Sequence, residues 1–190
     1  MMENNALMEM RQLAAYSSDR PVTMPEQLTT PLFTRPIDPE WKERINEKWW
    51  GTGYKGSLFS TNPDILKLRD HLLAFGGEEV CLPVKEPDLN NILQYGQLWT
   101  GRPVRTIKGD RSQCHRNVAY LWHTNQENGN IFICTGYALS DDGMWRQHSW
   151  ALILDQNKRE IVETTKKRVA YYGYAMDAER SMQFYKENVC

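Results

Sequence analysis

Cys114 is the residue of this chain whose placement first suggests covalent chemistry. It stands in the stretch RSQCHRNVAYLWH, in which Val118, Leu121 and Trp122 recur three or four residues apart and predict a helix that begins near Cys114. A cysteine acts as a nucleophile in its thiolate form, and an unperturbed thiol has a pKa of about 8.5. The positive end of a helix and a neighbouring imidazole both lower that pKa. Cys114 is placed for the first effect, and the second requires a histidine.

His148 is the histidine best placed to serve Cys114. His115 is adjacent in sequence, but it projects about 100° around the helix from Cys114. His123 lies roughly 13 Å further along the same helix at about 1.5 Å per residue, and His71 belongs to a different predicted helix, where we expect it to be partly exposed. His148 opens a predicted strand, and such a strand can lie across from a helix N-terminus.

Glu163 is the carboxylate expected to orient His148. The segment HSWALILDQNKREIVETT predicts a hairpin that turns at DQNK, and this pairing sets His148 opposite Thr164 or Thr165. Glu163 is then one or two positions away, within reach of its long side chain. A carboxylate there would fix the tautomer of the imidazole. The alternative is that Glu163 is an exposed strand carboxylate with no such role.

The elements around these residues predict an α+β fold. Four strands are indicated by β-branched and aromatic residues between turn signals, at 131–139, 148–155, 160–165 and 168–176. Helices are predicted at 60–75, with a cap at Ser60 or Asn62, and at 177–188, with Asp177 as N-cap. A helix, a run of antiparallel strands and a second helix predict that the helix bearing the cysteine packs on one side of a curved antiparallel sheet.

The N-terminal part has a different character. Five prolines lie between residues 20 and 39, which predicts an extended arm, and a helix is predicted before it at 4–16 and after it at 39–50, with Trp41, Ile45 and Trp49 inward. We therefore divide the chain into N-terminal helices with a proline-rich arm, residues 1–50, and a catalytic domain, residues 51–190. GTGYKGS lacks the lysine–serine pair of a phosphate-binding loop.

Composition excludes several classes of function. The net charge is −1, with 23 Lys and Arg against 24 Asp and Glu, so no overall basic charge indicates nucleic-acid binding, and the cluster at 166–168 is interpreted as a solvated turn. No signal peptide or membrane span is apparent, so the default expectation is a cytoplasmic protein, although signal-less secretion stays open. The four cysteines are too widely spaced for a disulfide scaffold.

Four short motifs in order resemble a known family. Ser112-Gln113-Cys114, Gly136-Tyr137, His148-Ser149-Trp150 and Glu163-Thr164-Thr165 resemble the transglutaminase-like branch of the papain-like cysteine enzymes, over about residues 111–174. The resemblance implies a papain-like core, with Cys114 as nucleophile, His148 as general base and acid, and Glu163 as orienting acid. Two positions depart from the family pattern. Glu163 replaces a more usual Asp, and Ser112 stands where a glycine is often found.

Further residues are candidates for lining the site. The Cys114 backbone N–H is one donor for an oxyanion, and Gln97, Trp99 or Gln113 is a candidate for the second. Asn117 would either line the site or decorate the helix. Trp150 is expected to shield the imidazole, with substrate binding as the alternative.

These residues predict a thiol-dependent amide hydrolase or acyl transferase that works through a thioester. A cysteine peptidase or a protein glutamine deamidase is the leading expectation, transglutamination is a further outcome, and a protein or peptide is the expected substrate. No cofactor is expected, and no metal, because the spacings of Cys114, His115, Cys134 and His148 fit no closed site. Two alternatives stay open: Cys114 as an inert core thiol, and a non-catalytic interaction module that retains a papain-like fold.

Overall fold

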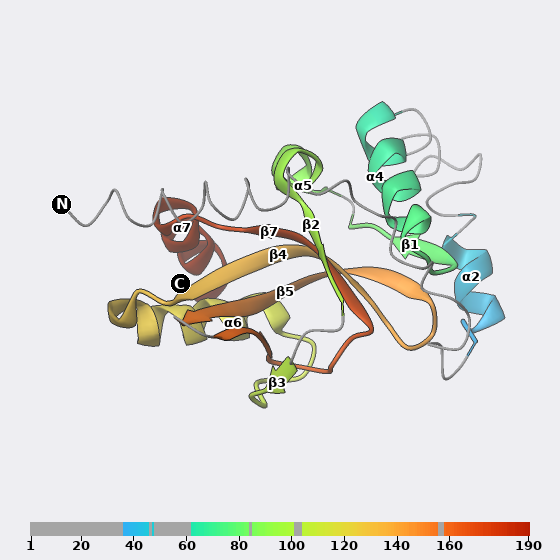
Figure 1. Cartoon of the computed structure of the whole chain (residues 1–190). Coiled ribbons are helices and arrows are strands. Elements are labelled where there is room, and N and C mark those ends of the chain that lie inside the picture. Colours follow the sequence, from blue (N-terminus) through green and yellow to red (C-terminus); the bar gives the residue numbers. More distant parts are fainter. Residues whose placement is uncertain (1–35, 46, 48–61, 84, 101–103, 156–157) are drawn as a thin grey trace.

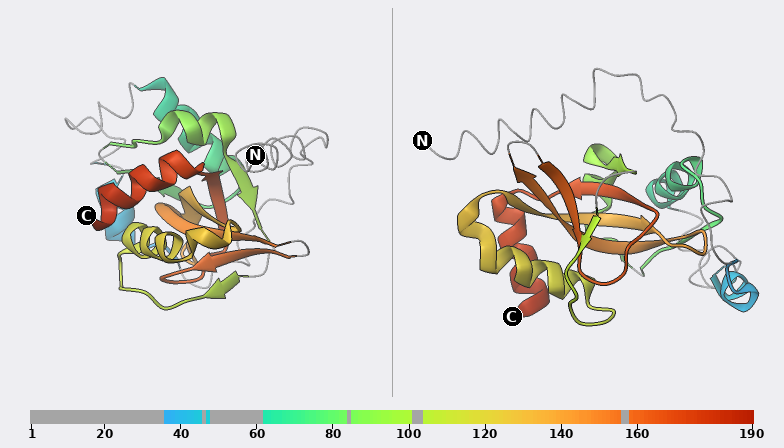
Figure 2. Two further views of the ribbon diagram at one scale, coloured as in Figure 1. Left: turned by 90° about the vertical axis from the view of Figure 1, so that its left-hand side faces the viewer. Right: turned by 60° about the horizontal axis from the view of Figure 1, so that its bottom comes forward.

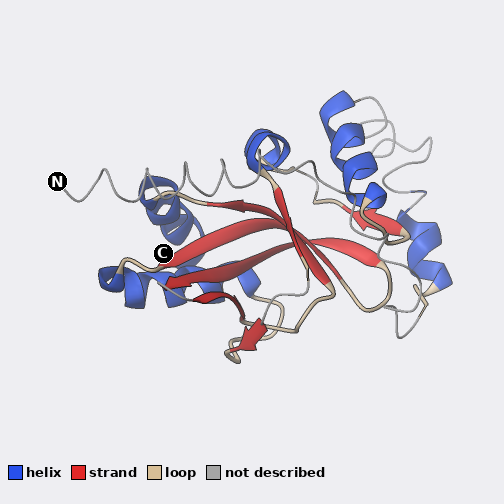
Figure 3. Ribbon diagram, in the orientation of Figure 1, coloured by secondary structure: helices blue, strands red, loops and turns tan. Residues whose placement is uncertain are grey.

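One curled sheet forms the centre of the molecule. The computed structural model describes residues 36–45, 47, 62–83, 85–100, 104–155 and 158–190. Within them, seven strands make one mostly antiparallel sheet in the order β2-β7-β4-β5-β6-β3, with β1 paired to β5 (Figure 1, Figure 3). The elements are α2 (Pro39–Ile45), α4 (Pro63–Ala74), β1 (Glu79–Cys81), α5 (Leu89–Tyr95), β2 (Gln97–Trp99), β3 (Val104–Thr106), α6 (Cys114–Asn125), β4 (Ile131–Leu139), β5 (Met144–Asp155), β6 (Lys158–Glu163), β7 (Ala170–Ala175) and α7 (Ala178–Val189).

Strands β4 and β5 are the longest and pair with one another along the whole of β4. Eight of the nine residues of β4 are buried, because side chains cover both faces of the sheet, and its sequence IFICTGYAL is accordingly apolar almost throughout. Strand β5 pairs first with β1 and then, from Ala151 onward, with β6. His148 and Ser149 of β5 lie between these two pairings.

Helices α6 and α7 lie side by side on one face of the sheet (Figure 2). Val118, Ala119 and Trp122 of α6 are buried in the larger apolar cluster, together with Phe184 of α7. A smaller cluster that includes Trp99, Trp150 and Tyr171 is separate from it. No helix in the described ranges has the length and apolar content to cross a membrane.

The α+β class and the order of helix, antiparallel strands and helix are confirmed. The register of the β5–β6 hairpin is also as predicted, since Leu154 pairs with Arg159 and this pairing extrapolates His148 to Thr165. Asn62 caps α4 and Asp177 caps α7, as expected.

Several details differ from the prediction. Strand β5 begins at Met144, four residues before His148, and two of the pairings, β1 with β5 and β3 with β6, are parallel. Of the helix expected at 39–50, the structure describes α2 over residues 39–45, in which Trp41 is 49% exposed while Ile45 is buried. The expected inward position of Trp41 is therefore wrong; its ring lies under the guanidinium of Arg44 instead. The helix predicted at 4–16, most of the proline-rich arm, and Trp49 lie outside the described residues.

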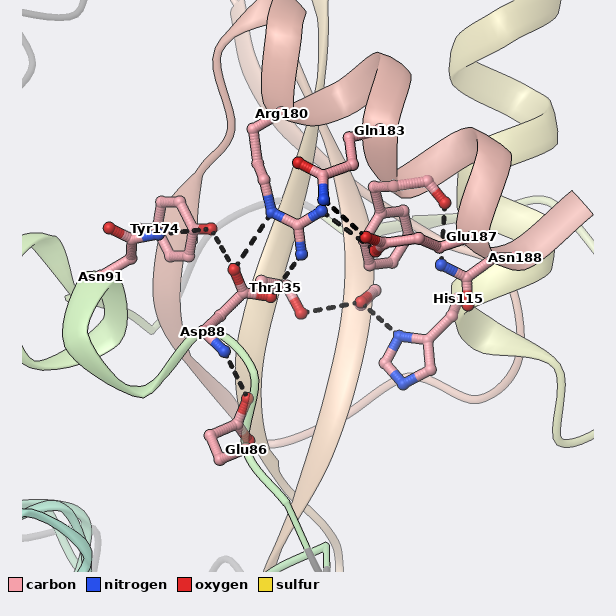
Figure 4. A network of polar contacts seen from close by, with 12 residues as sticks. Glu86, Asp88, Asn91, His115, Thr135, Tyr174, Arg180, Gln183, Glu187 and Asn188 are labelled. Carbon is pink, nitrogen blue, oxygen red and sulfur yellow. Dashed lines mark hydrogen bonds and ion pairs between the residues drawn. The ribbon is translucent and has the colours of Figure 1, made fainter.

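Asp88 joins three elements that are distant in sequence (Figure 4). It lies immediately before α5 and is 4% exposed. Its carboxylate accepts hydrogen bonds from the Tyr174 hydroxyl of β7 at 2.7 Å and from two nitrogens of Arg180 of α7 at 3.0 and 3.2 Å. Removal of one partner from such a buried pair leaves the other uncompensated.

We expect Asp88→Ala to lower the free energy of unfolding by about 3 kcal/mol, because Arg180 and the Tyr174 hydroxyl lose their shared acceptor. Urea unfolding followed by circular dichroism measures this. Asp70→Ala, on the exposed side of α4, is the matched control and should stay within about 0.5 kcal/mol of the wild type. Equal stability of the two variants would contradict the structural role of Asp88.

Candidate active site

Cys114 is the first residue of α6, and its helix end has no side-chain cap. Gln113 stands at the N-cap without capping, whereas the N-caps of α4 and α7 both accept backbone hydrogen bonds through their side chains. The first turn of α6 also carries no acidic residue. No side chain of the N-cap or first turn therefore neutralises the positive end of this helix. A thiolate at Cys114, the first residue of the helix, would be stabilised by it.

The loop that leads into α6 is tied down at both ends. Ile107 and Gly109 donate their backbone N–H groups to the carbonyls of Glu163 and Thr164, each at 2.9 Å. Nearer the helix, the Asn117 amide accepts from the Asp110 N–H at 3.1 Å and donates to the Asp110 carbonyl at 2.8 Å. Asn117 was a candidate for lining the site; the structure uses its side chain to hold this loop.

Ser112 has a backbone φ of +60°, and it is the one non-glycine residue with positive φ among the described residues. It stands two positions before Cys114, where the resembling family often has glycine. A residue with a Cβ pays about 1–2 kcal/mol in this left-handed conformation, and glycine does not. Ser112, which replaces that glycine, is therefore in a strained conformation, and the positive φ explains why glycine is favoured at this position.

Glu163 and His148 form a buried pair. Their exposed fractions are 0% and 2%, and the His148 Nε2 lies 2.8 Å from Glu163 Oε2, as the hairpin register predicted. The Tyr171 hydroxyl donates to the same oxygen at 3.1 Å. Glu163 Oε1 accepts from the backbone N–H of Thr165 at 2.8 Å and from its hydroxyl at 2.9 Å. Four donors thus satisfy the carboxylate, so its orientation toward His148 is fixed.

The other side of the imidazole interacts with Cys114. Since Nε2 is engaged by Glu163, Nδ1 is the nitrogen left to hydrogen-bond the Cys114 sulfur. The backbone N–H of Ser149 also donates to this sulfur. Strand β6 ends at Glu163, and its pairing with β5 does not extend to Ser149. The Ser149 N–H therefore bonds to the Cys114 sulfur at the start of α6 instead of to a carbonyl of β6.

These contacts determine the ionisation of the three groups. Burial by itself raises the pKa of the Cys114 thiol, but the hydrogen bonds and charge of His148 and the Ser149 N–H outweigh it, so this pKa lies below its usual value. Burial opposes a charged imidazole, yet Cys114 and Glu163 raise the pKa of His148 to about 9. Burial likewise disfavours the Glu163 carboxylate, while His148 and Thr165 hold its pKa below the usual value. A thiolate beside an imidazolium is the arrangement that these shifts favour at neutral pH.

Trp150 covers the imidazole, as one of the two sequence-based interpretations expected. Its ring stacks on His148 with 6.3 Å between centroids, and it is fully buried against Trp99 and Tyr171. The indole N–H has no hydrogen-bond partner among the described residues, so packing holds the ring. A Cβ on Gly173 would lie 2.9 Å from the Trp150 indole, which is one reason for glycine there.

Gly136 and Tyr137, the second motif, lie on β4 beside the site. Gly136 pairs with His148 on one side and with Gly173 on the other. A Cβ on Gly136 would lie 2.5 Å from the Gly173 Cα, so these two strands approach more closely than side chains would allow. Tyr137 is fully buried and donates to Glu86 at 2.6 Å, away from the thiol.

His115 points to the opposite face of β5 from His148. Its Nδ1 lies 2.6 Å from the Ser149 hydroxyl, which in turn lies 3.0 Å from that of Thr135 (Figure 4). Successive residues of a strand alternate between faces, so His115 is not placed to serve as the base for Cys114. It instead holds the strand at Ser149, the residue whose N–H contacts the sulfur. His123 stacks on Tyr185 at 4.1 Å, at the other end of α6.

The remaining candidates fall into two groups. Gln97 lies on β2 in the same row across the sheet as Gly173, Gly136 and His148, while Trp99 is buried against Trp150. Gln113 is exposed at the start of α6, next to Cys114. Their proposed contribution to an oxyanion site stays a prediction.

The other cysteines do not join the site. Cys134 is fully buried, and burial raises the pKa of its thiol, whereas Cys190 is exposed. Cys114, Cys134 and Cys190 are free thiols. Within the described ranges, no group of three or more His, Cys, Asp or Glu side chains is arranged to hold a metal ion.

Two contributors to the site were not anticipated from the sequence. Tyr171 reaches Glu163 from β7, and the Ser149 backbone reaches the Cys114 sulfur. The aromatic run AYYGYA marked β7 as a buried strand, but no local signal indicates that Tyr171 faces Glu163. Comparison of the chain with protein-family models, with curated proteins and with solved structures gave no match.

The strain at Ser112 can be measured. We expect Ser112→Gly to be at least as stable as the wild type, because glycine adopts a φ of +60° freely. Ser112→Val should lose about 1–2 kcal/mol, because a β-branched residue is penalised there. Chemical unfolding of both variants is the measurement, and a valine variant as stable as the wild type would contradict the conformation.

The reactivity of Cys114 can be measured without a substrate. Iodoacetamide should label Cys114 much faster than the exposed Cys190 at pH 6–7, because the pKa of Cys114 is lowered and more thiolate is present. The rate should fall as the pH drops through that lowered pKa. His148→Ala should abolish the preference for Cys114, and Glu163→Gln should reduce it.

Glu160→Gln, on the same strand but paired with Arg105 at the surface, is the matched control for Glu163→Gln. Mass spectrometry of tryptic peptides gives the labelling rate of each cysteine. Equal, slow labelling of Cys114 and Cys190 at pH 6–7 would show that the imidazole does not activate the thiol.

Proposed function

We propose that this protein is a thiol-dependent amide hydrolase with a papain-like core, acting as a cysteine peptidase or a protein glutamine deamidase. One observation carries the proposal: a buried imidazole is held by a fully hydrogen-bonded carboxylate on one side and meets a cysteine at an uncapped helix start on the other. This is the nucleophile, base and orienting-acid arrangement that covalent catalysis at a carbonyl requires. The resemblance of the four motifs to the transglutaminase-like branch also supports the proposal.

The reaction follows from the ionisation of the pair. The Cys114 thiolate attacks the amide carbon, and the carbonyl oxygen becomes an oxyanion against the start of α6, where the Cys114 N–H is a donor. The proton on His148 Nδ1 passes to the leaving nitrogen as the carbon–nitrogen bond breaks, which leaves a thioester and a neutral imidazole. His148 then takes a proton from water, the resulting hydroxide attacks the thioester, and the carboxylic product departs as the thiolate is restored.

Glu163 and Trp150 serve this cycle through His148. The carboxylate keeps Nε2 protonated and so leaves Nδ1 as the nitrogen that exchanges a proton with Cys114 and with the leaving group. The fully buried indole excludes water from one side of the ring. The identity of the leaving group, a peptide amine or the ammonia of a glutamine side chain, separates a peptidase from a deamidase.

An activated ester tests the thioester chemistry without a known substrate. We expect p-nitrophenyl acetate to acetylate Cys114 in a rapid burst followed by slower turnover, as measured by nitrophenol release and by intact mass. Cys114→Ala should show no burst, while Cys190→Ala, which removes an exposed thiol elsewhere, should behave as the wild type. Acetylation of Cys114 without turnover, or a burst that persists in Cys114→Ala, would contradict the proposal.

The same variants identify the reaction on proteins. Protein mixtures incubated in heavy-oxygen water with the wild type should gain the label either at new C-termini or at glutamine side chains converted to glutamate. New C-termini identify a peptidase and converted glutamines a deamidase. Both kinds of product should be absent with Cys114→Ala. Cross-linked products without label would show that an amine, rather than water, resolves the thioester.

A further inference from the structure

Two segments beside Cys114 carry a concentration of positive charge. Residues 104–117 and 163–168 together contain seven Lys and Arg against two Asp and Glu. The whole chain is nearly balanced, with 23 Lys and Arg against 24 Asp and Glu. These segments therefore carry an excess of positive charge, whereas the remainder of the chain, with 16 Lys and Arg against 22 Asp and Glu, carries an excess of negative charge.

Hydrogen bonds bring the two segments together at the thiol. The loop between β3 and α6 is joined to residues 163 and 164 through the N–H groups of Ile107 and Gly109. Arg111 stands three residues before Cys114 and Arg116 two residues after it, while Lys108 is next to Gly109. The loop and the start of α6 thus adjoin the sulfur, while the second segment begins at Glu163 and extends to the β4–β5 turn, where Lys166 contacts Asp141.

Part of this charge is neutralised within the protein. Arg105 pairs with Glu160 at 3.5 Å, Lys166 pairs with Asp141 at 2.8 Å, and Arg168 is partly buried and donates to the Ser140 hydroxyl. Of the two acidic residues in these segments, Glu163 is fully buried and engaged with His148, so Asp110 is the exposed one.

Four cations remain, and we call them the basic rim: Lys108, Arg111, Arg116 and Lys167. All four are exposed, and none makes an ion pair with another residue in the described part of the chain. Exposed like charges that repel one another contribute nothing to folding, so their clustering calls for a reason outside the fold. The ordered loop that presents Lys108 and Arg111 is the same one that leads into the nucleophile.

We propose that the basic rim selects the substrate, and that the substrate is an acidic protein segment, with Asp or Glu residues flanking the amide that Cys114 attacks. This rests on the function proposed above. Carboxylates within a Debye length of about 8 Å of the rim would be attracted and oriented before reaction, and salt would weaken that attraction. Lys108 and Arg111 of the rim stand on the loop that leads to a thiol suited to amide chemistry, which favours a polypeptide over nucleic acid as the partner.

Matched peptide probes test the charge preference. Two peptides carry the same acyloxymethyl ketone electrophile, one flanked by Glu and the other by Lys, and alkylation of Cys114 is followed by intact mass. We expect the acidic probe to react at least about tenfold faster at low salt, with the ratio approaching one at high salt. The double variant Lys108→Glu with Arg111→Glu should reverse the preference, and Lys167→Glu alone should reduce it.

The control variant is Lys67→Glu with Lys186→Glu, which places the same charge change on the exposed faces of α4 and α7. It should keep the wild-type ratio. Equal rates for the two probes, with Cys114 still reactive, would overturn the substrate inference and leave the proposed function intact. Failure of both probes and of p-nitrophenyl acetate to modify Cys114 would overturn the proposed function itself. Protection of Cys114 by a single-stranded RNA oligonucleotide, but not by an acidic peptide, would overturn the inference in favour of nucleic acid.

Discussion

The hydrogen bond between His148 and Glu163 is the interaction on which the site depends. Both side chains are buried at 2% exposure or less, and an isolated charge at such a depth would be costly. The structure offsets that cost with Tyr171 and Thr165, which supply the remaining hydrogen bonds to the carboxylate. The imidazole is thereby held with its other nitrogen toward Cys114. The lowered pKa of Cys114 and the raised pKa of His148 both favour a chain of alternating charge: thiolate, imidazolium and carboxylate.

Because β6 ends at Glu163, the Cys114 thiol can approach His148 and Ser149 of β5. Strand β6 stops at Glu163, and the segment after it turns away, so β5 is left without a strand partner on that side at Ser149. The Cys114 sulfur, at the start of α6, accepts the Ser149 N–H there. The loop before α6 is hydrogen-bonded to residues 163 and 164, so the segment that leads to Cys114 and the segment that contains Glu163 are joined. A shift of one would be transmitted to the other.

The central parts of this arrangement were predictable because their signals are local. Helical spacing after Cys114 and the turn between β5 and β6 depend on neighbouring residues, and the hairpin register then placed Glu163 near His148. Strands β1, β2 and β3 were missed because each has three residues and pairs with a distant segment. The roles of Asn117 and Ser149 could not be predicted because they depend on tertiary contacts. The Asn117 amide bonds to the backbone of Asp110, and the Ser149 N–H bonds to the Cys114 sulfur. Trp41 was misplaced because helical spacing groups residues on one face of a helix but does not show how much of that face is covered; Ile45 is buried and Trp41 is exposed.

The central claim is that Cys114 and His148 exist as a thiolate and an imidazolium at neutral pH. NMR titration of the His148 ring nitrogens in the wild type and in Cys114→Ala tests it most directly. The account predicts that both nitrogens stay protonated up to a pKa of about 9 in the wild type, and that this pKa falls when the thiolate is removed. A His148 pKa near the ordinary histidine value, unchanged in Cys114→Ala, would contradict it.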